Sequence, residues 1–404
     1  MTTSSSIAPD SLPVTQAKDA AAARPALARS RIEVIDVMRG LVMVIMLFDH
    51  VRETVYLHVP VTDPMDIANT EPMLYFTRIA AHFCAPMFVF LTGLGAWLYA
   101  NPSSGPRDPS GFLIKRGLLL IVLELTLVTF AWNGRIPPPT IWLQVIWVIG
   151  VCMIILGLVH RLPRWILGTV AFALVFGHNL LTPIHFQPGD TFYVPWTILH
   201  DRGFLIADGP TQLKVSYPLL PWIGVIIFGY LAGSLYSRSM DPAKRARTWT
   251  MLGTGSLALL LVLRGFNIYG ETLPWTVQPD LVHTVMSFLN FTKYPPSLDF
   301  LLLTLGVGFL LFPRLESLSN GFTRALAVFG GAPMFFYLFH LYFLLALQRI
   351  LVATVGANHG DRFGIDAYWP VWLISVAVLP VLYYPCRAFA RYKRTTDKAW
   401  VRYF

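Results

Sequence analysis

The sequence has few charged residues for its length. Asp, Glu, Lys and Arg make up 13% of its 404 residues, whereas hydrophobic residues make up 55%. A soluble globular protein usually carries about 25% charged residues. Apolar stretches long enough to cross a hydrocarbon core of about 30 Å recur along the chain. The composition therefore argues against an ordinary soluble enzyme and predicts a polytopic membrane protein embedded in a lipid bilayer.

Cysteine is also scarce. The three cysteines, Cys84, Cys152 and Cys386, lie in apolar surroundings and form no CxxC pair, so neither a disulfide framework nor a cysteine zinc site is predicted. No HxxxH or HExxH pair occurs either, and we therefore expect no metal. The net charge of +9 does not indicate nucleic-acid binding, because the basic residues cluster at the ends of the apolar stretches.

We expect an all-α polytopic membrane protein with about ten transmembrane helices. These spans are expected at about 33–57, 73–99, 111–132, 141–160, 164–183, 216–237, 248–266, 298–315, 324–352 and 368–390. Lys and Arg gather in alternate loops, which by the positive-inside rule places both termini in the cytoplasm. The Ser-, Ala- and Pro-rich residues 1–31 are predicted to form a disordered cytoplasmic tail. Residues 32–393 are then the membrane domain, and residues 394–404 a C-terminal cytoplasmic tail.

The first span carries a stripe of polar and methionine side chains on one face. The 3, 4, 3, 4, 3 spacing that defines this face joins Asp36, Arg39, Met43, Met46, His50 and Glu53. A charge at mid-bilayer costs roughly 2.5–3.5 kcal/mol, so the stripe should face protein or water. Asp36 and Arg39 can form an ion pair. Asp49 lies about 100° around the helix from His50, where it can support a partner helix or Arg52.

Four histidines from four different spans are expected at a similar depth. A rise of 1.5 Å per residue places His50 about 24 Å from the cytoplasmic edge, with His82, His178 and His340 near the same level. Arg78 and His82 share a helix face and can lie beside Asp49 and His50. Each histidine alone is readily explained as a helix-packing residue. Together with Asp49 and Arg78 they favour a polar cavity open to the periplasm.

This set of residues suits acyl transfer from a thioester to an alcohol or amine. A neutral histidine is the usual general base, and a nearby arginine can stabilise charge on a carbonyl oxygen. The predicted catalytic residues are His50, Asp49, Arg78 and His82. Cations at the cytoplasmic ends, Arg39, Lys115 and Arg116, are the predicted contacts of the phosphates of coenzyme A. The positive-inside rule alone also explains the "KRG" segment.

Several ordered motifs carry a resemblance to a known family. The segments "RIEVIDVMRGLVMVIMLFDH", "HFCAPMFVFLTG", "KRGLLL", "LQVIWVIGV", "TKYPPSLDFLLLTLG" and "FGGAPMFFYLFHLYF" resemble the heparan-α-glucosaminide N-acetyltransferase catalytic-domain family, over about residues 31–350. The resemblance implies a membrane acetyltransferase that uses cytoplasmic acetyl-CoA or another acyl-CoA and acts on an amino sugar across the membrane. In a bacterial inner membrane, a periplasmic or cell-envelope glycan or a lipid-linked sugar would be the acceptor.

The resemblance leaves the catalytic histidine open. The active histidine of the eukaryotic members lies in the first non-cytoplasmic loop, where His58 is the histidine of this chain, although its spacing from "RG" differs by a few residues. His50 instead matches the first-span histidine of the more distant transmembrane acyltransferase type 3 family. We favour His50 because of its polar neighbours and keep His58 second.

Two other functions fit parts of the pattern. The same intramembrane polar residues can form a proton-coupled path for a sugar or small metabolite, as in a transporter. A non-catalytic scaffold for an envelope assembly is the third possibility. Acyl-CoA turnover that depends on one histidine would distinguish the enzyme from both.

Overall fold

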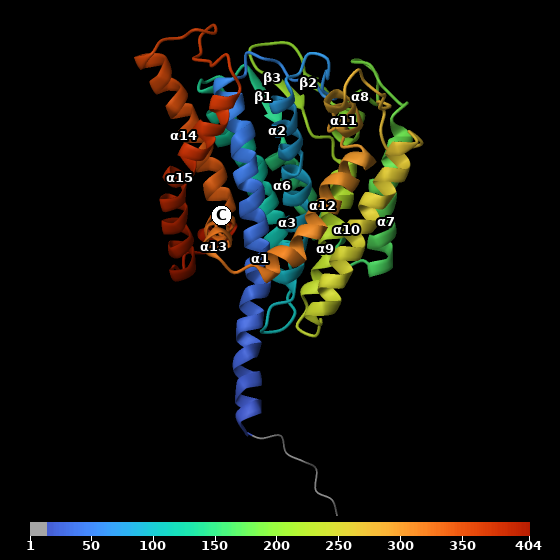
Figure 1. Ribbon diagram of the computed structural model, residues 1–404, viewed down its shortest axis with the longest axis vertical. Coiled ribbons are helices and arrows are strands. Elements are labelled where there is room, and N and C mark those ends of the chain that lie inside the picture. The colour runs from blue at the N-terminus through green and yellow to red at the C-terminus, as the bar shows by residue number, and fades with distance from the viewer. Residues whose placement is uncertain (1–13) are drawn as a thin grey trace, which may run out of the picture.

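Helices form most of the computed structural model, which describes residues 14–404 (Figure 1). The α-helices are α1 (Val14–Val55), α2 (Pro72–His82), α3 (Cys84–Ala100), α4 (Ser110–Leu123), α5 (Thr129–Asn133), α6 (Val145–Val159), α7 (Arg164–Gly177), α8 (Tyr193–Leu199), α9 (Leu220–Ala232), α10 (Pro242–Gly265), α11 (Leu281–Leu289), α12 (Leu298–Ser317), α13 (Gly321–Gly330), α14 (Pro333–Thr354) and α15 (Trp369–Thr395). Short π or 3-10 segments are η1 (Glu124–Val128), η2 (His178–Leu181), η3 (Gly233–Tyr236) and η4 (Ala399–Tyr403).

Six of the described helices are long and apolar enough to cross a membrane. They cover Pro72–Ala100, Arg164–Leu181, Pro242–Gly265, Leu298–Ser317, Pro333–Thr354 and Trp369–Thr395. Two further expected spans correspond to the shorter apolar helices Val145–Val159 and Leu220–Tyr236. The protein is therefore a largely helical, multi-pass membrane protein. The total of ten spans and the cytoplasmic placement of the termini stay predictions.

A small three-stranded sheet departs from the all-α expectation. Its strands are β1 (Thr140–Leu143), β2 (Gly203–Ile206) and β3 (Gln212–Val215), in the order β1-β3-β2. β3 pairs parallel with β1 and antiparallel with β2. Each strand has four residues, too short for a period-2 hydrophobic pattern to stand out from the surrounding loops. Figure 1 shows the sheet at one end of the bundle, which we call the strand end.

α1 runs through the bundle and extends beyond it at the opposite end, which we call the tail end (Figure 1). The backbone of residues 14–31 is part of this helix, whereas the sequence predicts a disordered tail over these residues. The Ala-rich segment "AKDAAAAR" explains the helix, because alanine has the highest helix propensity. Residues 1–13 of the expected tail lie outside the described residues, and the domain boundaries stay predictions.

Glycines bring α1 and α13 into backbone contact. A Cβ atom on Gly330 would lie 1.8 Å from the carbonyl oxygen of Asp36, and one on Gly40 would lie 1.9 Å from that of Leu326. No side chain fits at such distances, so only glycine allows this approach. The contact fixes the tail-end half of α1, where the predicted polar stripe begins, against the helix that precedes α14.

Candidate functional site

His50 of α1 and His340 of α14 form a direct imidazole pair. The His50 Nδ1 and His340 Nε2 atoms lie 2.7 Å apart, and the two rings are stacked with an interplanar angle of 13°. His340 is fully buried, and its Nδ1 lies 2.9 Å from the carbonyl oxygen of Phe336. The two histidines are 290 residues apart in the chain. α14 therefore supplies the partner that holds the ring of His50.

The Phe336 carbonyl fixes the proton positions of a neutral pair. A carbonyl oxygen can only accept a hydrogen bond, so His340 Nδ1 carries a proton and donates it. His340 Nε2 is then the acceptor, and His50 Nδ1–H must be its donor. His50 Nε2 is consequently left as an unprotonated nitrogen. This is the arrangement of a general base whose tautomer is set by the hydrogen bond that its other nitrogen makes.

Two aromatic side chains make T-shaped ring contacts with His50. The Trp132 ring lies with its centroid 5.0 Å away at an interplanar angle of 81°, and the Tyr337 ring lies 6.2 Å away at 73°. These T-shaped contacts restrict rotation of the imidazole. Each of the two aromatic residues also lines a different cavity, Trp132 the smaller one and Tyr337 the larger one.

A tail-end cavity of about 440 Å³ lies on the Tyr337 side. This volume is within the range of about 300–1,000 Å³ that is typical of small-molecule sites. Charged groups of its lining are Asp36, Arg39, Arg116 and Lys393. Arg39 donates to Asp36 at 2.6 Å, as the sequence predicted. Arg116 has a buried Nε without a hydrogen-bond partner among the described residues, and its side chain lines the cavity.

A smaller strand-end cavity lies on the Trp132 side. It has a volume of about 80 Å³ and contains the polar side chains of Glu53, Asn133, Gln348 and Arg349. These groups offer both hydrogen-bond donors and acceptors, as recognition of hydroxyl and amine groups requires.

The polar stripe predicted on α1 follows this path. Its tail-end members, from Asp36 to Met46, line the tail-end cavity. His50 comes next along the same face, and Glu53 lines the strand-end cavity. The predicted helix face thus contributes side chains to both cavities, whereas His50 and His340 themselves line neither.

Asp49 forms the centre of an ion-pair cluster on a different face of α1. Its Oδ1 accepts from Arg52 Nε at 2.9 Å, and its Oδ2 accepts from Arg78 Nη1 of α2. Arg52 also donates to Glu53 at 2.9 Å. Asp49 and Arg52 are buried, at 7% and 4% exposure. The expected pairing of Asp49 with a partner helix and with Arg52 is confirmed.

The remaining predicted residues lie apart from the histidine pair. His82 is buried against Phe300, with ring centroids 5.2 Å apart, and its Nδ1 has no hydrogen-bond partner among the described residues. His178 lies near His200, with ring centroids 6.2 Å apart. Lys115 is exposed and does not line the tail-end cavity, unlike its neighbour Arg116. Of the four histidines, the structure joins only His50 and His340.

Two loops beyond α1 add charged groups that the sequence did not point to. Lys293 is buried at 4% exposure, and its backbone N–H donates to Asp63 at 3.2 Å. Burial raises the pKa of Asp63, while the positive charges of Lys293 and Arg78 act in the opposite direction. In the sequence, the segment "TKYPPS" contributes only to the family resemblance, because one lysine in a loop carries no recognisable spacing.

His340, Trp132 and Lys393 were also missing from the predicted site. The sequence predicts His340 at the depth of His50, and this shared depth is the signal that could have identified His340 as a site residue. Trp132 and Lys393 gave no signal, because an aromatic residue and a lysine near span ends are common in membrane proteins.

His58, the second candidate for the base, lies beyond the end of α1, eight residues after His50. It stacks on His359, with ring centroids 3.7 Å apart, and not on the His50–His340 pair. Burial lowers the pKa of His58, and His359 shifts that pKa in the same direction while Asp366 opposes it.

The family comparison matches the part of the chain that holds most of this site. A family model described as "Heparan-alpha-glucosaminide N-acetyltransferase, catalytic" matches residues 31–265. This region contains α1 from residue 31 onward, α2 and the lining of the tail-end cavity from Asp36 to Met153. His340 and Lys393 lie outside the match. A comparison with curated proteins gave no match.

Proposed function

Because the chain belongs to the heparan-α-glucosaminide N-acetyltransferase catalytic-domain family, we propose that it is an integral-membrane acyltransferase that transfers an acetyl or other short acyl group from acyl-CoA to a sugar or glycan acceptor. One observation carries the proposal for this chain. The two aromatic rings in T-shaped contact with His50 line two different cavities: Tyr337 lines the tail-end cavity and Trp132 lines the strand-end cavity. An acyl donor and an acceptor can thus approach one base from opposite sides of a membrane.

The acyl donor is assigned to the tail-end cavity. Arg39, Arg116 and Lys393 give its lining an excess of positive charge over Asp36. Such side chains suit the phosphates of coenzyme A. The apolar part of the lining, with Met43 and Met46, then accommodates the thioester arm on its way to Tyr337. Lys115 is exposed outside this lining, and its proposed role is limited to attracting the donor to the tail end.

His50 Nε2 is assigned the role of general base. It takes the proton of the acceptor amine or hydroxyl as that nitrogen or oxygen bonds to the acyl carbon. The carbon–sulfur bond breaks, and the thiolate takes up a proton to leave as free coenzyme A. His340 is a positioning residue, because it holds His50 through Nδ1 and makes no assigned contact with substrate.

Asp49 and Arg78 are assigned as positioning residues for the same reaction. Their pair joins α1 to α2 one residue before His50 and so fixes the rotation of α1 about its axis. His82 is retained as a further proposed positioning residue, because it is buried and lines neither of the two cavities. The strand-end cavity, with Glu53 and Gln348, is the proposed acceptor subsite.

The proposed location is a bacterial inner membrane, with the tail end in the cytoplasm. The alternate clustering of Lys and Arg supports this orientation. Acyl-CoA is a cytoplasmic metabolite and would then meet the cationic cavity directly. The acceptor would be a periplasmic or envelope glycan, acylated on nitrogen or oxygen.

The test is acyl transfer by the purified protein in sealed proteoliposomes. Acetyl-CoA is supplied on one side of the membrane and glucosamine-bearing glycans are enclosed on the other, and both released coenzyme A and acylated glycan are measured. His50→Ala is expected to lower kcat by about 10²–10⁴-fold, the usual contribution of a general base. His340→Ala should lower kcat in the same direction, because it removes the group that orients His50.

Matched controls separate a chemical role from misfolding. His283, a partly exposed histidine paired with Asp280, is replaced by alanine and should leave kcat unchanged. Full turnover by His50→Ala would contradict the assignment of His50 and leave the enzyme in place. Glycan movement across the membrane without acyl-CoA would instead favour the transporter.

A further inference from the structure

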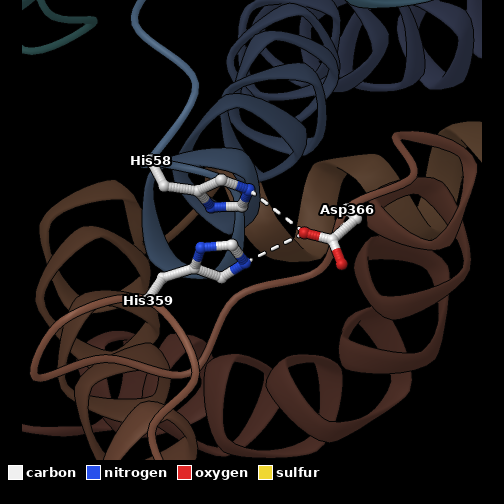
Figure 2. A group of neighbouring side chains, drawn as sticks. All are labelled: His58, His359 and Asp366. Carbon is white, nitrogen blue, oxygen red and sulfur yellow. Dashed lines mark hydrogen bonds and ion pairs between the residues drawn. The ribbon is translucent and has the colours of Figure 1, made fainter.

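A compact cluster of two histidines and one aspartate lies at the strand end, outside the proposed acyl-transfer path. Figure 2 shows His58 and His359 stacked face to face, with the Nε2 atoms of both rings directed at one carboxylate oxygen of Asp366. The rings are 3.7 Å apart between centroids and 9° from parallel. The His359 Nε2–Asp366 Oδ1 distance is 2.9 Å, and the His58 Nε2–Asp366 Oδ1 distance is 3.8 Å.

These separations match those between ligand atoms around a small cation. Zn²⁺ binds histidine nitrogen and carboxylate oxygen at about 2.0–2.2 Å, so two ligand atoms of a tetrahedral site lie roughly 3.4 Å apart. The measured 2.9 and 3.8 Å fall on either side of this value. All three potential ligand atoms lie within 4.8 Å of one another. Splaying the two stacked rings by side-chain rotation would turn both Nε2 lone pairs toward one ion.

The loop that carries two of these residues is held in place by bonds that do not involve them. This loop runs from Val355 to Tyr368 and connects α14 to α15. Its Ile365 N–H donates to the carbonyl of Val55 at 2.9 Å. Gln348 Nε2 donates to the carbonyls of both Thr54 and Phe363, at 2.6 and 2.9 Å. The end of α1 and the loop are therefore joined before any ion is added, which lowers the entropy cost of assembling a site.

Gly364 provides the space in which the two imidazoles stack. A Cβ atom at this position would lie 2.4 Å from His359 Cδ2 and 2.9 Å from His58 Nδ1. Both rings would have to move. The cluster borders a cavity of about 190 Å³ that Arg362 also lines, which leaves room for a water ligand. The Arg362 charge opposes a cation, so the affinity depends on Asp366, whose side chain is 85% exposed.

The geometry points to a binding site for one Zn²⁺-class divalent cation, with His58, His359 and Asp366 as ligands and water in the fourth position. Two imidazoles and one carboxylate are a usual donor set for such ions. The ion would tie the end of α1 to the loop beside the acceptor subsite, since Thr54 and Arg362 line both neighbouring cavities. The inference does not depend on the proposed acyl transfer.

The test is metal binding by the full-length protein in detergent, purified with an affinity tag that contains no histidine. Zn²⁺ is titrated in competition with a chromophoric chelator, and Co²⁺ is titrated separately to record its visible absorption bands. We expect one equivalent of Zn²⁺ and a Co²⁺ spectrum of four-coordinate intensity. Replacing His58 or His359 by alanine, or Asp366 by asparagine, should weaken binding at least tenfold.

Two further variants make the result specific. Gly364→Ala keeps all three ligands but displaces the rings, and should weaken binding as well. His283→Ala removes a histidine that already has an aspartate partner at 2.6 Å, and it should leave the titration unchanged. Equal binding by wild type and His359→Ala, or no stoichiometric binding by the folded wild type, would overturn the inference. Size-exclusion profiles identical to wild type exclude misfolding as the cause of any loss.

Discussion

The ion-pair cluster around Asp49 makes a quantitative prediction. Asp49→Asn keeps the shape of the side chain and removes the charge that Arg52 and Arg78 share. Arg52 retains Glu53 as a partner at 2.9 Å. Among the described residues, Arg78 has no second hydrogen-bond partner and its side chain is 12% exposed. The substitution therefore leaves one buried guanidinium without a hydrogen-bonded counter-ion.

Removing one member of a buried ion pair costs about 3–5 kcal/mol. We expect Asp49→Asn to lower the free energy of unfolding by the lower part of this range, because Arg52 keeps one partner. Arg78→Gln alone should also destabilise, since it leaves Asp49 with only Arg52. The double variant should lose less free energy of unfolding than the two single variants lose together. The difference, which is the coupling energy, should be about 1–3 kcal/mol. Denaturant unfolding in detergent, followed by tryptophan fluorescence, measures all four proteins of the cycle.

A second buried pair serves as the control. Arg245 and Glu316 join α10 to α12, with side chains 4% and 17% exposed. Glu316→Gln should destabilise by a comparable amount and leave the kcat of acyl transfer unchanged. Asp49→Asn should lower kcat, because it frees α1 to rotate at His50. Additive effects in the Asp49–Arg78 cycle would refute the argument that these two charges depend on each other.

Two further predictions concern helix contacts. Gly330→Ala must move α13 away from the Asp36 carbonyl, which would lie 1.8 Å from the added Cβ. We expect about 1–3 kcal/mol of destabilisation and a raised KM for acetyl-CoA. Gly255→Ala, with nothing within 4 Å of its Cβ, should cause no destabilisation, because alanine favours the helix, and should leave the KM unchanged. Glu124 accepts from the Trp147 backbone N–H at 3.0 Å, so Glu124→Leu should cost about 1–3 kcal/mol in unfolding experiments, while Glu124→Gln, which keeps an acceptor, should cost less than half as much.

The sequence was sufficient to predict contacts within one helix. The periodicity of α1 predicts a face that includes Asp36, Arg39 and Glu53, and in the structure this face contributes Asp36 and Arg39 to one cavity and Glu53 to the other. The Asp36–Arg39 pair and the Asp49–Arg52 contact follow from the same three-residue spacing. Helix periodicity is a property of neighbouring residues, so it can be read from the sequence directly.

Contacts between distant segments could not be obtained in this way. The partner of His50 lies 290 residues further along the chain, and which of the three other histidines it would be depends on how α14 packs. The predicted depth in the membrane did not distinguish His82, His178 and His340 as partners of His50. His58 meets His359 and Asp366 only because one loop folds back onto the end of α1, for which no motif spacing exists.

The adjacent Asp49 and His50 explain why a membrane helix carries both a carboxylate and an imidazole at this depth. Successive residues of an α-helix point about 100° apart, so the two side chains contact different neighbouring helices. Asp49 pairs with Arg78 of α2, and His50 pairs with His340 of α14. A rotation of α1 that improved one contact would break the other, and the rotation is therefore fixed. With the Phe336 carbonyl setting the proton on His340, the unprotonated nitrogen of His50 has one orientation relative to the two cavities.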